Sequence, residues 1–186
     1  MSETVPEFAL DRIRLRPVRP SDLPAVYVGL SDPLVIAHYG VSYSSIEATE
    51  AQMQWFEKIV AEQTGAWWAI ADLKDDSMIG ACGFNDWSQH HRRVELGYWL
   101  MPTYWRQGLL TDALPSVFRY AFEVMGVHRI HADVEPANEA SCALLRKLGF
   151  HHDGTLRDVE LKDGEFLSLH QYSLLRTDPV ARMYLD

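Results

Sequence analysis

The chain has 186 residues, enough for one domain with its own core and too few for two. Its formal net charge of −9 disfavours non-specific binding to nucleic acid and suits a cationic partner, such as an amine or a basic polypeptide. The two cysteines, Cys82 and Cys142, lack the spacing of a disulfide framework or a cysteine zinc site. Because no stretch resembles a signal peptide or a membrane span, we expect a protein of the reducing cytoplasm, without a membrane partner.

The first half of the chain predicts one strand, two helices and three further strands. Charged and apolar residues alternate over residues 11–18, which is the period of a half-buried strand. A helix follows the cap residues 20–22, and a second opens at residues 44–47 and ends at Gly65. The apolar face of this second helix is expected at Ala51, Trp55, Phe56 and Ile59. The strands are expected at residues 66–73, 78–85 and 93–100, with turn-type residues between them.

The second half predicts helices and strands in alternation, and then a hairpin. A helix is expected at residues 109–125, a strand at 129–135, and a short helix at 139–148 that ends at Gly149. Strands at 151–161 and 165–175 are joined by a turn at 162–164. The tail, 176–186, carries no predicted element. Runs of strands with a few crossing helices indicate a single α+β domain over residues 1–186.

The loop YWRQGLLTDA, residues 104–113, joins a predicted strand to a predicted helix. A helix N-terminus has unpaired N–H groups and a partial positive charge, and a glycine there lets the backbone approach an anion. Thr111 can add a hydroxyl donor and Arg106 a charge. Composition alone favours a plain turn over an anion site. Pro115, one turn further on, indicates that the helix either begins late or kinks.

The order and spacing of these segments resemble the GNAT N-acetyltransferases, and within them the RimL/RimJ type, which acetylates protein N-termini. The resemblance runs from RLRPVRPSDL near the start to the hairpin LRDVELKDGEFLSLHQYSLL, and includes VELGYWLMPTYWRQGLLTDA and NEASCALLRKLGF. It implies the GNAT fold: a mixed, mostly antiparallel seven-stranded sheet with about four helices, whose fourth and fifth strands splay apart. It also implies acetyl-CoA as co-substrate, and family habit allows a homodimer.

The resemblance assigns the anion loop to the pyrophosphate of coenzyme A. The family pattern is Gln or Arg, two residues, Gly, one residue, and then Gly or Ala. Gly108 fits the central glycine, while Trp105 takes the first place and Leu110 replaces the last small residue. The implied contacts are the strand end and the loop, together with the asparagine that opens the short helix: Leu100, Met101, Arg106, Gln107, Gly108, Leu109, Leu110, Thr111 and Asn138.

Two carboxylates are candidates for the base that deprotonates the amine. Glu95 lies within a predicted central strand, where a carboxylate is costly to bury unless it is paired, and many GNAT enzymes carry a basic glutamate on this strand. Glu160 precedes the hairpin turn, where the RimL/RimJ type has a glutamate that acts through water. Composition alone reads Glu160 as a hairpin-end carboxylate. The sequence does not choose between the two glutamates.

The short helix offers a candidate acid for the departing thiolate. Many GNAT enzymes carry a tyrosine on this helix, but this chain has Leu145 there, which cannot donate a proton. The RimL/RimJ pattern implicates Ser141 instead, as acid or thiol contact. Cys142 points about 100° away around the helix and is expected to pack. Asn138 is also an ordinary helix cap.

Several tryptophans, histidines and arginines could also belong to an acceptor groove, a phosphate contact or a metal site. Trp67, Trp68 and Trp87 could line an acceptor groove, although aromatic residues in strands more often belong to the core. The run His90 to Arg93 could meet an acidic acceptor or a phosphate, but a solvated turn is the simpler interpretation. His128 and His131 have no companion ligands, so no metal site is expected.

Taken together, these patterns predict direct acetyl transfer to a primary amine. The expected acceptor is a protein N-terminus, with a small amine such as a polyamine, amino acid or aminoglycoside as the alternative. A catalytically idle CoA-binding module would need none of Glu95, Glu160 and Ser141. A structural protein without nucleotide is the remaining alternative.

Overall fold

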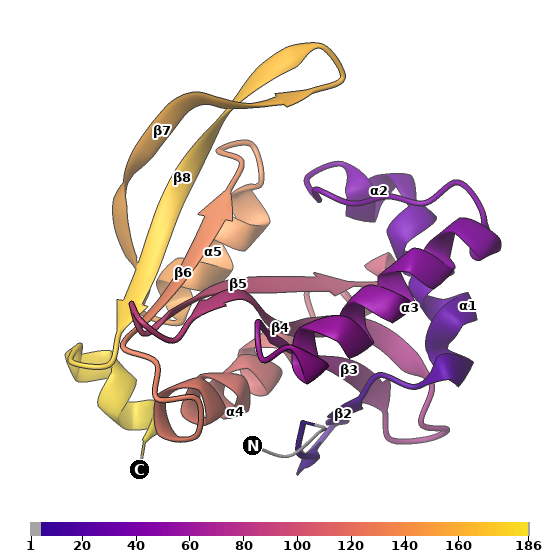
Figure 1. The fold of residues 1–186 in the computed structure, drawn as a ribbon, viewed down its shortest axis with the longest axis horizontal. Helices are drawn as coiled ribbons and strands as arrows, with labels where there is room; N and C mark the ends of the chain where they lie inside the picture. Colours follow the sequence, from indigo (N-terminus) through magenta and orange to yellow (C-terminus); the bar gives the residue numbers. More distant parts are fainter. Residues whose placement is uncertain (1–4, 186) are drawn as a thin grey trace.

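The strands of residues 5–185, the part of the chain that the computed structural model describes, pair into one eight-stranded sheet (Figure 1). Neighbouring strands follow the order β1-β2-β3-β4-β5-β6-β8-β7. All neighbours are antiparallel except β5 and β6, which are parallel. The strands are β1 (Phe8–Ala9), β2 (Ile13–Pro17), β3 (Ala66–Asp72), β4 (Met78–Ser88), β5 (Arg93–Leu100), β6 (Arg129–Val134), β7 (His151–Lys162) and β8 (Glu165–Leu175).

Helices cover both faces of this sheet. They are α1 (Leu23–Ser31), α2 (Pro33–Ile36), α3 (Ile46–Ala61), α4 (Leu109–Glu123) and α5 (Glu139–Lys147), with 3-10 turns η1 (Pro20–Asp22), η2 (Pro102–Tyr104) and η3 (Pro179–Tyr184). We call the side packed against α4 and α5 the α4 face, and the side packed against α1, α2 and α3 the α3 face. Among the described residues, no helix is long and apolar enough to span a membrane.

Strands β5 and β6 separate soon after they begin. They pair only through Arg93, Val94 and Glu95 on β5, opposite residues 129–131 of β6. Beyond Glu95 the two strands diverge, and Figure 1 shows β6 and the β7–β8 hairpin rising away from β5. The expected splay of the fourth and fifth predicted strands is therefore confirmed, together with the α+β class and the mostly antiparallel sheet.

The structure corrects several details of the sequence prediction. The sheet has eight strands instead of seven, because the two-residue β1 is too short to show a period. Five α-helices form among residues 5–185, and the additional one, α2, starts where Asp32 accepts a hydrogen bond from Leu34 N. Helix α4 begins at Leu109 and contains Pro115, so a late start is wrong.

The buried face of α3 is rotated from the predicted one. Ala51 is exposed and Trp55 is half-buried, whereas Thr49 and Gln52 are buried beside Phe56 and Ile59. Both polar side chains have local partners: the Thr49 hydroxyl donates to the Ser45 carbonyl at 2.9 Å, and Gln52 accepts from Tyr43 at 2.9 Å. Burial of a satisfied polar group costs little, and a hydrophobic count cannot anticipate it.

The chain after Arg176, which has no predicted element, packs onto the domain. Ala181 of η3 is fully buried, and the Tyr184 hydroxyl donates to the Leu148 carbonyl at 2.8 Å. Residues 1–4 and 186 lie outside the described part of the chain.

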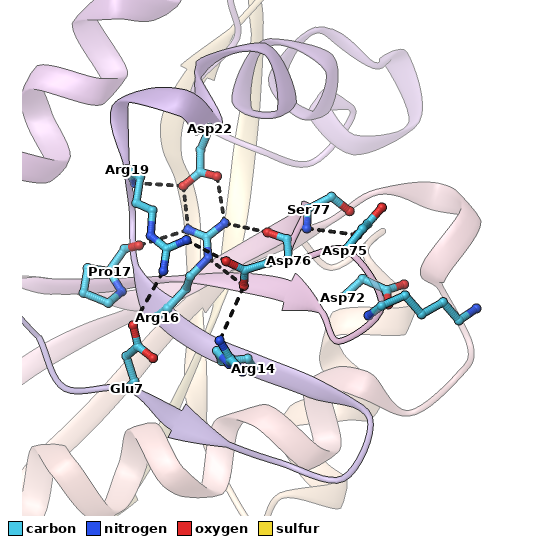
Figure 2. A network of polar contacts seen from close by, with 11 residues as sticks. Glu7, Arg14, Arg16, Pro17, Arg19, Asp22, Asp72, Asp75, Asp76 and Ser77 are labelled. Atoms are coloured by element: carbon cyan, nitrogen blue, oxygen red, sulfur yellow. Dashed lines mark hydrogen bonds and ion pairs between the residues drawn. The ribbon is translucent and has the colours of Figure 1, made fainter.

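A buried ion pair fixes the entry into α1 (Figure 2). The Arg16 side chain is 2% exposed and donates to both oxygens of Asp22, at 2.8 and 2.9 Å. Its remaining donors reach the Pro17 carbonyl and, across the β3–β4 turn, the carboxylate and carbonyl of Asp76. This bidentate, fully paired arrangement ties β2, η1 and the β3–β4 turn together, and so it sets where the α1–α2 segment starts.

Replacing Arg16 with methionine should destabilise the protein strongly. Removing one partner of a buried pair leaves an uncompensated charge, here on Asp22, at a cost of about 3–5 kcal/mol. Unfolding in urea, followed by tryptophan fluorescence, measures the loss. The half-buried neighbour Arg14, which lies 4.0 Å from Asp76, is the control; because its ion pair is long and partly solvated, the same substitution there should cost at most about 1 kcal/mol. Equal effects of the two substitutions would contradict the role of Arg16.

Candidate functional site

The splay leaves backbone groups of β5 facing the opening. The N–H of Met101 donates to the Ile79 carbonyl on β4. Because backbone groups alternate in direction along a strand, those of Trp99, Gly97 and Glu95 also point towards β4. The backbone groups of Leu96, Tyr98 and Leu100 therefore point the other way, towards β6 or the gap. The Leu100 carbonyl is taken by Trp105 Nε1 at 2.6 Å, and the Met101 carbonyl by Tyr104 N at 2.9 Å. The Leu100 N–H and both backbone groups of Tyr98 remain at the opening.

The loop before α4 has the backbone conformation of an anion cradle. Gly108 is left-handed, with φ of 77°, and is followed at once by the right-handed first turn of α4. Such a left-to-right succession turns consecutive N–H groups into one concavity. Arg106 is also left-handed, with φ of 59°. Among residues 5–185, no backbone carbonyl accepts a hydrogen bond from the N–H of Arg106, Gln107 or Gly108.

Side chains brace this loop from both ends. Trp105, at the first position of the family pattern, ties the loop to the end of β5 through its bond to Leu100. Gln107 Nε2 donates to the Thr103 carbonyl at 2.9 Å. Leu110, in place of a small residue, packs against the core of the α4 face, so its side chain is directed away from the cradle. Thr111 is half-buried in the first turn of α4.

Arg12 is a cation beside this loop that sequence reasoning missed. A Cβ added to Gly108 would lie 3.5 Å from Arg12 Nη2. The guanidinium is held there by Asp112, in the first turn of α4, which accepts from Nε at 3.0 Å and from Nη2. Both side chains are about half exposed. The chain separates Arg12 from the loop by a large part of the sheet, so no local motif could reveal this contact.

Helix α5 places Ser141 against a tyrosine from β5. The Asn138 side chain accepts from Ser141 N at 3.1 Å, which confirms its capping role and leaves its amide nitrogen without a partner among residues 5–185. Ser141 Oγ lies 2.6 Å from the Tyr98 hydroxyl. Burial raises the pKa of Tyr98, so this phenol stays protonated. Leu145 and Cys142 are buried, as the sequence predicts for Cys142.

Glu95 lies on the opposite side of β5, on the α3 face. It is half-buried and accepts from Asn85 Nδ2 at 3.0 Å. Burial, hydrogen bonding to Asp86 and the negative charges of Asp133 and Asp86 raise its pKa to about 7, against the opposing effect of Asn85. A carboxyl with that pKa is poised to exchange protons near neutral pH. Glu95 is thus a candidate base whose pKa is raised by its surroundings.

Gly97, two residues after Glu95 on the same face of β5, has no side chain and leaves space there. A Cβ on Gly97 would come within 2.7 Å of the Trp67 ring, so only glycine leaves room for this indole against β5. Trp67 itself is buried and packs edge-on against Trp55 of α3 at 5.7 Å. Trp68, on the other face, is fully buried in the core. Of the three tryptophans considered for an acceptor groove, Trp67 and Trp68 therefore belong to the core, on opposite faces of the sheet.

Glu160 lies elsewhere, on the exposed strand β7 near the tip of the β7–β8 hairpin. Its side chain makes no hydrogen bond or ion pair within residues 5–185. Two residues on, Lys162 Nζ donates to the Ala37 carbonyl at 2.7 Å and lies 3.4 Å from Glu135. Glu135 also contacts His38 Nδ1 at 2.7 Å. These contacts join the hairpin, the end of β6 and the segment after α2 across the opening.

An open surface cavity of about 580 Å³ lies near Glu95, which is not itself one of the lining residues. It is lined by Thr64, Asp86, Trp87, Ser88, Arg93 and His131. The register explains its position, because Glu95 faces Asn85 on β4 and His131 on β6. A bulge between Asn85 and Ser88, with Asp86 at a φ of 50°, widens the sheet there. Strand β4 thus continues past its predicted end, through residues expected to form a turn.

Within residues 5–185, no group of three or more His, Cys, Asp or Glu side chains is placed to hold a metal ion. Burial lowers the pKa of His131 and keeps its ring neutral at neutral pH.

Comparison with known proteins identifies a family for this chain. The acetyltransferase (GNAT) domain family matches residues 12–151. An uncharacterized N-acetyltransferase of Bacillus subtilis (strain 168), YoaA, is 34% identical over 92% of this chain and 97% of its own length. The [ribosomal protein uS5]-alanine N-acetyltransferase of Escherichia coli (strain K12) is 26% identical over 63% of this chain and 61% of its own.

A solved structure shows the same fold at lower identity. The spermidine N-acetyltransferase from Vibrio cholerae, in complex with CoA and spermine, superposes with a TM-score of 0.79 over 94% of this chain and 98% of that one, at 18% identity. The splayed sheet, the loop before α4 and the family match lead to one conclusion. This chain belongs to the GNAT acetyltransferase family and is an N-acetyltransferase.

Proposed function

We propose that this enzyme transfers the acetyl group of acetyl-CoA directly to the α-amine of a protein N-terminus. The observation that carries the proposal is the division of chemistry across β5. The Tyr98–Ser141 pair and the loop before α4 lie on one side of the strand, and Glu95 lies on the other. Two substrates that approach from opposite faces would meet in the gap between β5 and β6.

The residues present fit coenzyme A. The concave N–H groups at Gly108 and the first turn of α4 would hold the pyrophosphate, with Arg12 and Arg106 adding positive charge. Gln107, Leu109, Leu110 and Thr111 would contribute backbone groups, and the free amide nitrogen of Asn138 would reach the pantetheine arm. The Leu100 N–H at the opening is available to the same arm, while the Met101 N–H is already bound to β4.

The reaction needs a base, a support for the oxyanion and a proton for sulfur. Glu95, once ionised, would accept the proton of the incoming ammonium group directly or through water. The neutral amine nitrogen would then attack the thioester carbonyl, and the backbone N–H groups of β5 at the gap would stabilise the oxyanion. As the C–S bond breaks, the nitrogen would release its second proton to solvent water, so that a neutral amide forms; solvent would also restore the proton that Tyr98 gives up. The neutral Tyr98 hydroxyl, relayed by Ser141, would donate to the departing sulfur in place of the absent tyrosine at Leu145.

A small polyamine is the second candidate acceptor. Glu95, Asp86 and Asp133 bring negative charge together on the α3 face, and these charges suit a ligand with several ammonium groups. The relatives cover both classes by name, since one acts on a ribosomal protein and another on spermidine.

Glu95→Gln should lower kcat/KM by about 10²–10⁴-fold, the usual contribution of a positioned acid or base. In the unsubstituted enzyme, kcat/KM should rise with pH through about 7, because the base must be ionised and the environment raises the pKa of Glu95 to that value. Thiol release at a series of pH values measures both effects. Glu160→Gln is the matched comparison: if that variant alone loses the rise near pH 7, Glu160 is the base.

Tyr98→Phe should lower kcat by about tenfold or more, as expected when an acid contribution is lost, and leave the Kd of CoA nearly unchanged. Steady-state kinetics with calorimetry on the same preparation separates the two quantities. A weakened Kd with unchanged kcat would show that the hydroxyl only shapes the binding site.

Arg12→Gln should weaken CoA binding by about tenfold, comparable with one hydrogen bond to a charged group, and the deficit should shrink as salt is added. Calorimetric titration at low and high ionic strength gives the result. Arg14→Gln, two residues further along the chain on β2, supplies the control. Equal affinities for the Arg12 variant and the unsubstituted enzyme would remove Arg12 from the cradle.

A further inference from the structure

Most of the residues that line the cavity are neighbours of Glu95 in the sheet. Arg93 is two residues before Glu95 on the same face of β5, a separation of about 6.6 Å along a strand. His131 faces Glu95 from β6, and Asp86 is close enough to Glu95 to raise its pKa by hydrogen bonding. An amine placed at Glu95 therefore has this cavity as its immediate surroundings, and one or two extended residues would span it.

The cavity holds charges of both signs. Asp86 supplies a carboxylate and Arg93 a guanidinium, while the hydroxyls of Thr64 and Ser88 can both donate and accept. Arg93 and His131 both line the cavity, so the guanidinium belongs to the same part of the site as the ring opposite Glu95. The Arg93 side chain is exposed and makes no hydrogen bond or ion pair within residues 5–185. Its donors are thus available to a ligand.

Two lining side chains also carry buried nitrogens without partners in the described part of the chain. These nitrogens are Trp87 Nε1 and His131 Nδ1. Unpaired buried nitrogens are uncommon in native proteins, and ordered water or a bound polar group often accounts for them. The two nitrogens themselves are shielded from solvent, so it is the polar side chains of Thr64, Asp86, Ser88 and Arg93 that favour a polar occupant of the cavity.

The chemistry of the two acceptor classes differs at this point. A polyamine offers only N–H donors and positive charge, so the free guanidinium of Arg93 would repel it. A peptide offers carbonyl acceptors as well as N–H donors, and can satisfy Arg93 and Asp86 at once. We propose, on the basis of the acetyltransferase function above, that this cavity binds the main chain of the first residues of a peptide acceptor. Arg93 holds a peptide carbonyl and selects against polyamines.

Reversal of one charge tests the assignment. Arg93→Glu should lower kcat/KM for short N-terminal peptides by about tenfold or more, the loss of one hydrogen bond to a charged group. The same variant should keep or improve kcat/KM for spermidine, since the cavity then carries only negative charge. Arg93→Gln should show the same peptide loss and a smaller gain for spermidine, because it removes the repulsion without adding a negative charge; this variant covers the case in which the charge reversal disturbs folding. Arg182→Glu, on η3, is the control for the change in net charge.

The measurements separate the role of the cavity from the acetyltransferase function on which it rests. CoA affinity by calorimetry should be the same in all variants. Peptide turnover that is insensitive to both Arg93 substitutions would overturn the role of this cavity and leave the proposed function standing. A wild-type enzyme that acetylates spermidine but no peptide would overturn both the role of the cavity and the protein N-terminus as acceptor. A failure to acetylate any amine would instead overturn the proposed function itself, and the cavity assignment with it.

Discussion

The short pairing of β5 with β6 is the constraint on which the site depends. Only three residue pairs join these strands, after which β5 continues beside β4 while β6 follows β8. A longer pairing would close the gap and would use the backbone groups of Tyr98 and Leu100 within the sheet. The interruption costs hydrogen bonds, but it leaves polar backbone at the middle of the domain, where a thioester and an amine could meet.

Because successive side chains of a strand point to opposite faces of the sheet, β5 alone places reactive side chains on both faces. Tyr98 meets Ser141 on the α4 face, while Glu95 and Arg93 point to the α3 face. The surrounding layers reinforce this separation. Helices α4 and α5 provide N-termini and small polar groups suited to a phosphate-bearing arm, and the α3 face provides carboxylates, a guanidinium and a cavity suited to a polar acceptor. The contacts of Lys162 and His38 with Glu135 span the opening on the acceptor side.

The sequence was informative where the relevant residues are neighbours in the chain. The loop around Gly108, the cap at Asn138 and the alternation that places Glu95 on one face are local features, and all three have the expected backbone setting. Contacts between distant segments had no such signal. Tyr98 and Ser141 are 43 residues apart, and Arg12 and Asp112 are 100 apart. The cavity depends on a bulge at Asp86 within residues whose composition indicates a turn. The sequence shows only that Leu110 departs from the small residue of the family pattern, whereas in the structure its side chain packs against the core of the α4 face.

The central claim is that the two substrates reach one gap from opposite faces of β5. A crystal structure with a bisubstrate analogue, in which the sulfur of CoA is joined through an acetyl linker to the N-terminus of a short peptide, tests it most directly. The account predicts that the pantetheine arm lies between β5 and β6, with the linker beside Tyr98 and the peptide on the face that carries Glu95 and Arg93. Both halves of the analogue on one face of the sheet, or a pantetheine arm outside the gap, would contradict it.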